Sequence, residues 1–369
     1  MSSALFSPIS LRGLTLANRI AVSPMGMGLA EDGRASDWYL MHFGNLALSG
    51  AGLVIVGATG VSPEGRSSPW CLGLWNDAQV ESYRPMIEFC RRHGGAKLGI
   101  QLQHSGRKGS VAPPFENNRF LGPDEGGWEL AAPSAIAYPK RPAPREMSAE
   151  DIKQLIRDFG TAAANAHQAG FDLLELHCAH GYMLHQFLSP LTNHRSDKYG
   201  GSLEARMRAP LEAFRAVRDN WPADLPLGVR VSATDWIEGG WTIEDSIVFA
   251  QRLADLGCDY VTASSGGISP EQKITVKPGY QVDFAAAIRR EAKIATMAVG
   301  LITEARQAEA IVADGRSDMV ALGRGMIFNP RWAWHAAVEL GESYFLPPQY
   351  ERSHPSMRGG DFLKPSARA

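Results

Sequence analysis

Short runs of apolar and β-branched residues recur along the chain, and each is followed by a stretch with the spacing of a helix. Continuous apolar strands are typical of parallel sheets whose two faces are covered by helices. About eight such units in alternation favour a closed (β/α)8 barrel over an open sheet. The strands are expected at residues 19–25, 52–60, 97–104, 171–177, 226–233, 258–266, 295–300 and 317–325.

Two of the intervening stretches carry clear helix signals. Residues 77–94 are amphipathic, and residues 148–170 begin with Ser148 and Asp151 in capping-box spacing and stop at Gly170. The main alternative is a doubly wound open sheet, but the motif G-x-G-x-x-G is missing after the first strand. We therefore expect an α/β fold consisting of a single (β/α)8 TIM barrel.

Two segments do not fit the strand–helix repeat. Residues 109–147 form a long Pro/Gly-rich connection after the third strand. Because this connection leaves the carboxyl end of a strand, where barrel active sites lie, we expect it to form a wall or lid. From Ser353 onward the chain is polar and rich in Pro, Gly and Ser, which predicts a barrel domain over 1–352 and a loose tail over 353–369.

Composition and charge limit the classes of function. Of the 369 residues, 44% are hydrophobic and 21% charged, and the net charge of -2 gives no electrostatic reason to expect nucleic acid or a membrane surface as a partner. The four cysteines include no C-x-x-C pair, which argues against an iron–sulfur cluster, a structural zinc site and a disulfide framework. No signal core or apolar run of about 18 residues occurs, so a reduced, soluble, cytoplasmic protein is expected.

Polar residues and glycines gather where the predicted strands end. They are Gln101 and His104 on the third strand, His177 and His180 on the fourth, Arg230 on the fifth, Gly300 on the seventh, and Gly323 and Arg324 on the eighth. Glycines after the last two strands let backbone N–H groups approach a phosphate, and Arg324 adds a charged contact. This arrangement favours a phosphorylated cofactor over the barrel mouth, and FMN fits because Gln101 can read its pyrimidine edge and Arg230 can stabilise negative charge on its ring.

The chain resembles the Old Yellow Enzymes, and within them the bacterial branch that includes the xenobiotic reductases. The resemblance runs in order through nearly the whole chain. Its markers are VSPEGR (61–66), GIQLQHSGRK (99–108), APSAIA (132–137), REMSAEDI (145–152), the stretch that begins ELHCAHGYMLHQFLSP (175–208), RVSATDW (230–236), PGYQVDFA (278–285) and LGRGMI (322–327).

The resemblance implies an FMN enzyme that takes hydride from NADPH or NADH and delivers it to the C=C bond of an α,β-unsaturated carbonyl or nitro compound. It implies that His177 and His180 donate hydrogen bonds to the carbonyl oxygen of the substrate and that Tyr182 gives a proton to the α-carbon. The flavin contacts that it implies are Ser23, Pro24, Met25, Ala58, Gln101, Arg230, Gly300, Gly323 and Arg324.

The chemistry of these side chains agrees with the implied roles. Hydride addition to an enone places negative charge on the carbonyl oxygen, and each preorganised N–H donor in a dry pocket stabilises such an oxyanion by about 2.7–4 kcal/mol. Histidine offers an N–H donor whether neutral or charged. The phenol of Tyr182 is a weak acid, yet it is adequate for protonating a developing carbanion.

The chain departs from its family at two places and matches it at a third. Gly26 and Gly28 stand where relatives usually carry a cysteine and a tyrosine, so neither role can be carried over, and more room on the substrate side is expected. Arg352 matches an arginine that in this branch reaches the active site of the neighbouring protomer, which predicts a homodimer or homotetramer.

Three other interpretations stay open. The flavin enzyme can run the reverse hydride transfer, as a desaturase or dehydrogenase. His177 and His180 can belong to a metal-dependent barrel hydrolase or lyase, although no further ligand stands at a familiar spacing. A flavin carrier without catalytic activity is the third.

Overall fold

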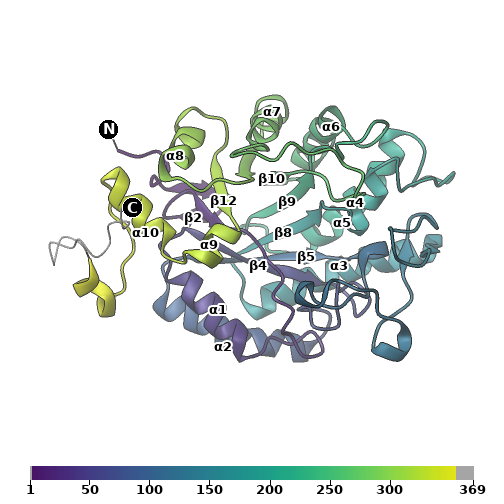
Figure 1. The fold of residues 1–369 in the computed structure, drawn as a ribbon, viewed down its shortest axis with the longest axis horizontal. Coiled ribbons are helices and arrows are strands. Elements are labelled where there is room, and N and C mark those ends of the chain that lie inside the picture. The colour runs from purple at the N-terminus through teal and green to yellow at the C-terminus, as the bar shows by residue number, and fades with distance from the viewer. Residues whose placement is uncertain (1, 355–369) are drawn as a thin grey trace, which may run out of the picture.

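Eight parallel strands close into a barrel in the computed structural model, which describes residues 2–354 (Figure 1). All eight strands expected from the hydrophobic pattern are present, so the predicted (β/α)8 fold is confirmed. In chain order they are β3 (Ile20–Val22), β4 (Leu53–Gly60), β5 (Lys97–Gln103), β8 (Leu173–Cys178), β9 (Leu227–Ser232), β10 (Tyr260–Ser264), β11 (Ala295–Val299) and β12 (Met319–Leu322).

Helices connect the strands and cover the outside of the barrel (Figure 1). They are α1 (Asp37–Ala47), α2 (Asp77–His93), α3 (Ala149–Ala169), α4 (Met183–Leu188), α5 (Leu203–Asp219), α6 (Ile243–Asp255), α7 (Val282–Ala292), α8 (Ala305–Ala313), α9 (Arg324–Phe328) and α10 (Trp332–Leu340). The helix predicted from Ser148 is α3: the Ser148 hydroxyl accepts from the Asp151 N–H, and Gly170 ends the helix with φ 102°. Only glycine adopts such a φ without strain.

A short hairpin closes the amino end of the barrel, and the sequence pattern did not predict it. Strand β1 (Ile9–Leu11) pairs antiparallel with β2 (Leu14–Leu16). Leu11, Leu14 and Leu16 are buried in one apolar cluster with interior residues of the barrel strands, such as Tyr260 and Met319. The interior is therefore filled with side chains at this end, as in other barrels of this class.

The connection after β5 is more ordered than a plain loop. It contains the 3₁₀ turns η1 (Gly106–Lys108), η2 (Pro114–Glu116) and η3 (Pro123–Glu125), and strand β6 (Ala131–Ala132) pairs with β7 (Arg145–Glu146). The Arg107 guanidinium donates to the carbonyl oxygens of Ile136 and Ala137, and also to that of Ile268 in the loop after β10. These bonds anchor the connection, which forms a wall beside the carboxyl ends of the strands, as expected.

The last described segment is the 3₁₀ turn η4 (Pro348–Ser353). The tail expected over 353–369 therefore falls almost entirely outside the described residues. Within residues 2–354, no helix has both the length and the apolar character that a membrane span requires.

Candidate active site

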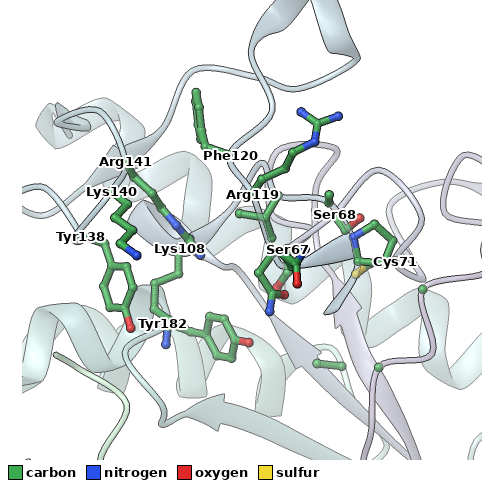
Figure 2. A pocket seen from close by; sticks show the side chains of 18 of the residues that line it. Ser67, Ser68, Cys71, Lys108, Arg119, Phe120, Tyr138, Lys140, Arg141 and Tyr182 are labelled. Carbon is green, nitrogen blue, oxygen red and sulfur yellow. The ribbon is translucent and has the colours of Figure 1, made fainter. Parts of the chain in front are cut away.

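Two cavities lie at the carboxyl end of the barrel, on either side of the segment that follows β3. The smaller has a volume of about 450 Å³, and the larger, shown in Figure 2, about 750 Å³. The first is lined by the expected flavin contacts Ser23, Pro24, Met25, Arg230, Gly300, Gly323 and Arg324. The second is lined by Gly26, Gly28, Ala58, Tyr182 and much of the wall after β5. The expected phosphate contacts and most of the expected ring contacts thus line the smaller cavity, Tyr182 and Ala58 line the larger one, and His177, His180 and Gln101 line neither.

His177 and His180 face one another at the end of β8. The Nε2 atom of His177 lies 3.4 Å from Nδ1 of His180, and the two rings are nearly perpendicular, at 85°. Burial lowers the pKa of both rings well below the usual value, and the nearby Arg230 charge lowers the pKa of each further. Both imidazoles are therefore neutral at pH 7, so each carries a single N–H, and the position of that hydrogen decides what the ring can do.

The tautomer of His177 is determined by its own backbone. The N–H of Ala179 donates to Nδ1 of His177 at 3.1 Å. A neutral imidazole that accepts at one nitrogen carries its hydrogen on the other. The hydrogen of His177 is therefore on Nε2, the atom that faces His180.

The tautomer of His180 depends on a serine at the end of β10. The Ser264 hydroxyl lies 2.7 Å from Nε2 of His180. Its other acceptor, Oε1 of Gln281, is 3.4 Å away and already accepts from Ser265 at 2.6 Å. The Ser264 hydrogen is therefore best placed on the short bond to His180, which puts the hydrogen of His180 on Nδ1.

The turn that carries His180 is held in a conformation that few residues adopt. His180 and Gly181 have φ values of 58° and 71°. A Cβ atom at Gly181 would lie 2.2 Å from the carbonyl oxygen of Gly267, so only glycine fits there. The N–H of His180 donates to the Ser232 hydroxyl at 2.9 Å, and Lys108 Nζ donates to the carbonyl oxygens of His180 and Gly267 at 2.8 and 2.9 Å. These bonds stabilise the turn.

Tyr182 comes next and is the N-cap residue of helix α4. Its ring lies across that of His177, with centroids 5.0 Å apart, and it lines the larger cavity (Figure 2). Burial raises the pKa of the phenol, so it holds its proton at pH 7. The site thus brings together two N–H donors and one O–H donor from a stretch of six residues.

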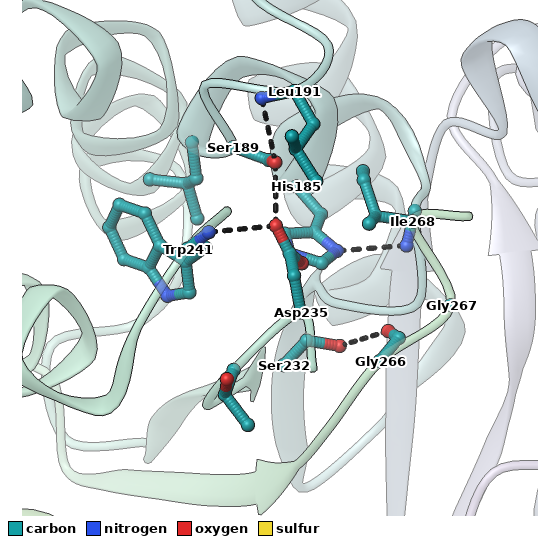
Figure 3. A network of polar contacts seen from close by, with 12 residues as sticks. His185, Ser189, Leu191, Ser232, Asp235, Trp241, Gly266, Gly267 and Ile268 are labelled. Carbon is teal, nitrogen blue, oxygen red and sulfur yellow. Dashed lines mark hydrogen bonds and ion pairs between the residues drawn. The ribbon is translucent and has the colours of Figure 1, made fainter. Parts of the chain in front are cut away.

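A buried network behind α4 holds this stretch in place (Figure 3). The N–H of Gly181 donates to Nδ1 of His185 at 2.9 Å, so the ring hydrogen is on Nε2, which lies 3.0 Å from Oδ1 of Asp235. Asp235 also accepts from the Ser189 hydroxyl and the Trp241 N–H. Burial alone would raise the pKa of Asp235, but the contacts with His185, Ser189 and Trp241 outweigh it and lower the pKa.

Gln101 and Arg230 meet the requirements of a flavin ring. Gln101 Nε2 donates to Glu175 at 2.7 Å, and Thr262 donates to the other oxygen at 2.6 Å, so the amide oxygen of Gln101 is left to accept an N–H from a pyrimidine edge. Arg230 donates to the Ser23 hydroxyl at 3.1 Å, while its buried Nε has no partner among the described residues. Burial raises the pKa of Glu175, although the Arg230 charge opposes it. An unpaired guanidinium N–H beside an open cavity fits a ring that gains negative charge.

The opposite end of the smaller cavity suits a phosphate. Gly300 has φ 121°, and a Cβ atom there would lie 2.7 Å from Nε2 of Gln281. Gly323 and Arg324 line the same space. Close backbone approach and one arginine are the features that phosphate sites use in this type of barrel. The residues present therefore fit FMN at both of its ends.

Three further residues that the sequence analysis named can be placed in the structure. Arg352 is exposed on η4 and lines neither cavity. His104 is structural: its Nδ1 accepts from the Gly106 N–H, and burial lowers its pKa to about 4. At Gly26 an added Cβ would meet no atom within 4 Å, so the missing side chain leaves open volume.

Sequence reasoning did not find the supporting residues Lys108, Glu175, Ser264 and Asp235. Glu175 could have been noticed, because it is a charged residue inside the apolar strand FDLLELH and a buried carboxylate needs partners. The roles of Ser264 and Asp235 depend on contacts between different strands, which no local pattern contains.

In the part of the chain that the structure describes, no group of three or more His, Cys, Asp and Glu side chains is placed to hold a metal ion.

Comparisons with known proteins identify the family of the chain. Residues 4–342 match the model of the NADH:flavin oxidoreductase / NADH oxidase family. An NADPH dehydrogenase of Geobacillus sp. (strain WCH70) is 45% identical over 355 residues, covering 95% of this chain and 99% of the relative.

Two solved structures are similar over most of the chain. A morphinone reductase has a TM-score of 0.78 at 28% identity, covering 97% of this chain and 93% of that one. A 2-naphthoyl-CoA reductase in complex with 2-naphthoyl-CoA has a TM-score of 0.82 at 26% identity, covering 92% of this chain and 52% of that one.

The network behind α4 gives a prediction about stability. Asp235→Asn removes the carboxylate charge beside His185 and should lower the free energy of unfolding by about 1–3 kcal/mol, the cost of leaving a buried polar partner unsatisfied. Asp255→Asn, an exposed aspartate on α6, is the control and should change it by less than about 0.5 kcal/mol. Urea denaturation measures both, and equal stability of the two variants would contradict the role given to Asp235.

Proposed function

We propose that this chain reduces the C=C bond of activated alkenes. The chain belongs to the NADH:flavin oxidoreductase / NADH oxidase family, the Old Yellow Enzymes, and is therefore an NAD(P)H-dependent flavin oxidoreductase with FMN as its cofactor. The substrates are α,β-unsaturated carbonyl compounds and related nitro compounds. The names of the structural neighbours, a morphinone reductase and a 2-naphthoyl-CoA reductase, support reduction as the direction of the reaction.

One observation carries the proposal: the two ring nitrogens to which the hydrogens are assigned lie 3.4 Å apart. With hydrogens on His177 Nε2 and His180 Nδ1, two nitrogens 3.4 Å apart can both donate to one oxygen at about 2.8–3.0 Å from each. Such a pair of donors binds a carbonyl oxygen and holds it more strongly as it becomes anionic. An activated alkene develops its negative charge on that oxygen.

The remaining steps belong to the side chains around the pair. When FMN is bound, it supplies the hydride that NADPH or NADH has delivered to it. Tyr182, whose phenol is protonated at pH 7, gives a proton to the α-carbon from the larger cavity. The wall after β5 shields the reacting atoms from water, which strengthens the two hydrogen bonds to the oxygen.

The direct test separates the two halves of the reaction. The protein should be yellow, lose its colour with NADPH or NADH, and regain it with 2-cyclohexen-1-one. Tyr182→Phe should slow only the second step, by about 100-fold or more, because the proton donor is missing. Stopped-flow absorbance of the flavin measures both steps.

Tyr138→Phe serves as the matched control, since it removes a hydroxyl from the same cavity and should leave both steps nearly unchanged. Equal slowing of both steps by Tyr182→Phe would count against a proton-donor role. A colourless protein would refute the proposed function itself.

The tautomer of His180 can be tested through Ser264. Ser264→Ala removes the hydrogen bond that keeps the His180 hydrogen on Nδ1, so binding of a phenol at the imidazole pair should weaken by about 2- to 10-fold. Ser317→Ala, which removes a buried hydroxyl at the opposite end of the barrel, is the control. Titration of the flavin spectrum gives the dissociation constants, and identical values for both variants would exclude this role for Ser264.

We also propose that the protein is a homodimer or homotetramer in which Arg352 acts on the active site of a neighbouring copy. Arg352 is exposed and lies outside both cavities of its own chain, so it can contribute to a site only in another copy. Arg352→Ala should raise the KM for the alkene while flavin reduction is retained, and the exposed Arg306→Ala should not. Light scattering and activity assays check this, and a monomer with full activity would refute the proposal.

A further inference from the structure

The larger cavity is strongly cationic. Its wall includes the side chains of Lys108, Arg119, Lys140 and Arg141, which lie around it in Figure 2. Throughout residues 2–354, no aspartate or glutamate lines this cavity. A cavity with charges of one sign concentrates ligands of the opposite sign.

Two of these cations lack a compensating carboxylate. The Nη1 of Arg141 is buried and has no hydrogen-bond partner within the described chain. When protonated, Lys108 Nζ uses two of its three hydrogens on backbone carbonyls, which leaves one donor. Arg141 and Lys108 both lie about 5.0 Å from the ring of Tyr138. Arg119 differs, because its charge is paired with Glu125 at 2.5 Å.

This arrangement is costly for the protein alone. Burial, and then the charges of Arg141 and Arg107, lower the pKa of Lys108 to about 7, so the cations repel one another in a region of low dielectric. A buried donor without a partner adds a further cost. The flavin phosphate does not supply the missing anion, since Gly300, Gly323 and Arg324 line the other cavity. Unpaired charges beside a reactive tyrosine are typical of a ligand site.

We propose that the larger cavity binds ligands carrying an anionic oxygen group, a carboxylate or a phosphate, which Arg141 and Lys108 contact. Tyr182 lines this cavity and its ring lies 5.0 Å from that of His177, so the imidazoles of His177 and His180 hold the other, reacting end of the same ligand. The inference rests on the proposed function, because that function places the reacting end at the imidazoles. The anion belongs either to an acidic substrate or to the phosphates of the nicotinamide coenzyme.

The first experiment compares two phenols of equal size that differ in charge. The carboxylate 4-hydroxyphenylacetate and the uncharged 4-hydroxyphenylacetamide are titrated into the FMN-loaded enzyme, and the flavin spectrum reports the dissociation constants. The unaltered enzyme should bind the carboxylate more tightly. Arg141→Gln should weaken carboxylate binding by about 10- to 100-fold, as expected for loss of a charge-assisted hydrogen bond, and amide binding by less than about twofold.

Arg119→Gln is the matched control, since that arginine lines the same cavity but is already paired with Glu125. It should weaken neither ligand by more than about twofold. Arg141→Lys should restore part of the carboxylate affinity, because it keeps the charge.

The second experiment identifies the source of the anion. The dissociation constants of NADPH and NADH are measured by rapid flavin reduction in Arg141→Gln. Weaker binding of the coenzyme as well as of the carboxylate assigns the anion to the coenzyme phosphates, and unchanged coenzyme binding with weaker carboxylate binding assigns it to an acidic substrate. No loss for either would overturn the inference. Failure of the proposed function is distinguishable, since it would appear as the absence of FMN or of any reduction of 2-cyclohexen-1-one by the unaltered enzyme.

Discussion

Two neutral imidazoles that must both donate to one oxygen are the constraint on which this site depends. A neutral imidazole has one hydrogen, so each ring needs a donor at its other nitrogen to direct that hydrogen inward. The Ala179 N–H serves His177, and the Ser264 hydroxyl serves His180. Burial and the charge of Arg230 keep both rings neutral, which makes these two contacts decisive. With a charged ring, the tautomer would not matter.

The barrel supplies these contacts from several strands at once. Ser232 at the end of β9 accepts from the backbone N–H of His180, and Ser264 at the end of β10 bonds to its ring, so neighbouring strands position both the backbone and the ring. The same principle holds for Gln101. The buried Glu175 on β8 accepts hydrogen bonds from Gln101 on β5 and from Thr262 on β10, so three strands are joined at this point. Asp235, from the loop after β9, fixes α4 through His185. A rigid scaffold of this kind reduces the reorganisation that the reaction requires.

The hydrophobic pattern was sufficient for the barrel, because the eight strands are mainly apolar and their burial on both faces leaves a strong signal. The hairpin β1–β2 was missed, since three-residue strands are too short for a period to appear. The histidine pair and Tyr182 were predicted from their order in the chain and from family resemblance. The tautomer of His180 could not be predicted, because Ser264 is 84 positions from His180 in sequence and yet 2.7 Å from it in space. The unpaired charge of Arg141 was likewise invisible, since pairing is a property of the folded cavity.

Nitrogen-15 NMR of the histidine rings in the FMN-loaded enzyme tests the central claim most directly, because the ring shifts report which nitrogen carries the hydrogen. Replacing each histidine in turn assigns the signals. His177 should carry its hydrogen on Nε2 and His180 on Nδ1, and both rings should stay neutral when the pH is lowered through the usual histidine pKa near 6.5. A hydrogen on Nε2 of His180, or charging of either ring at that pH, would contradict it.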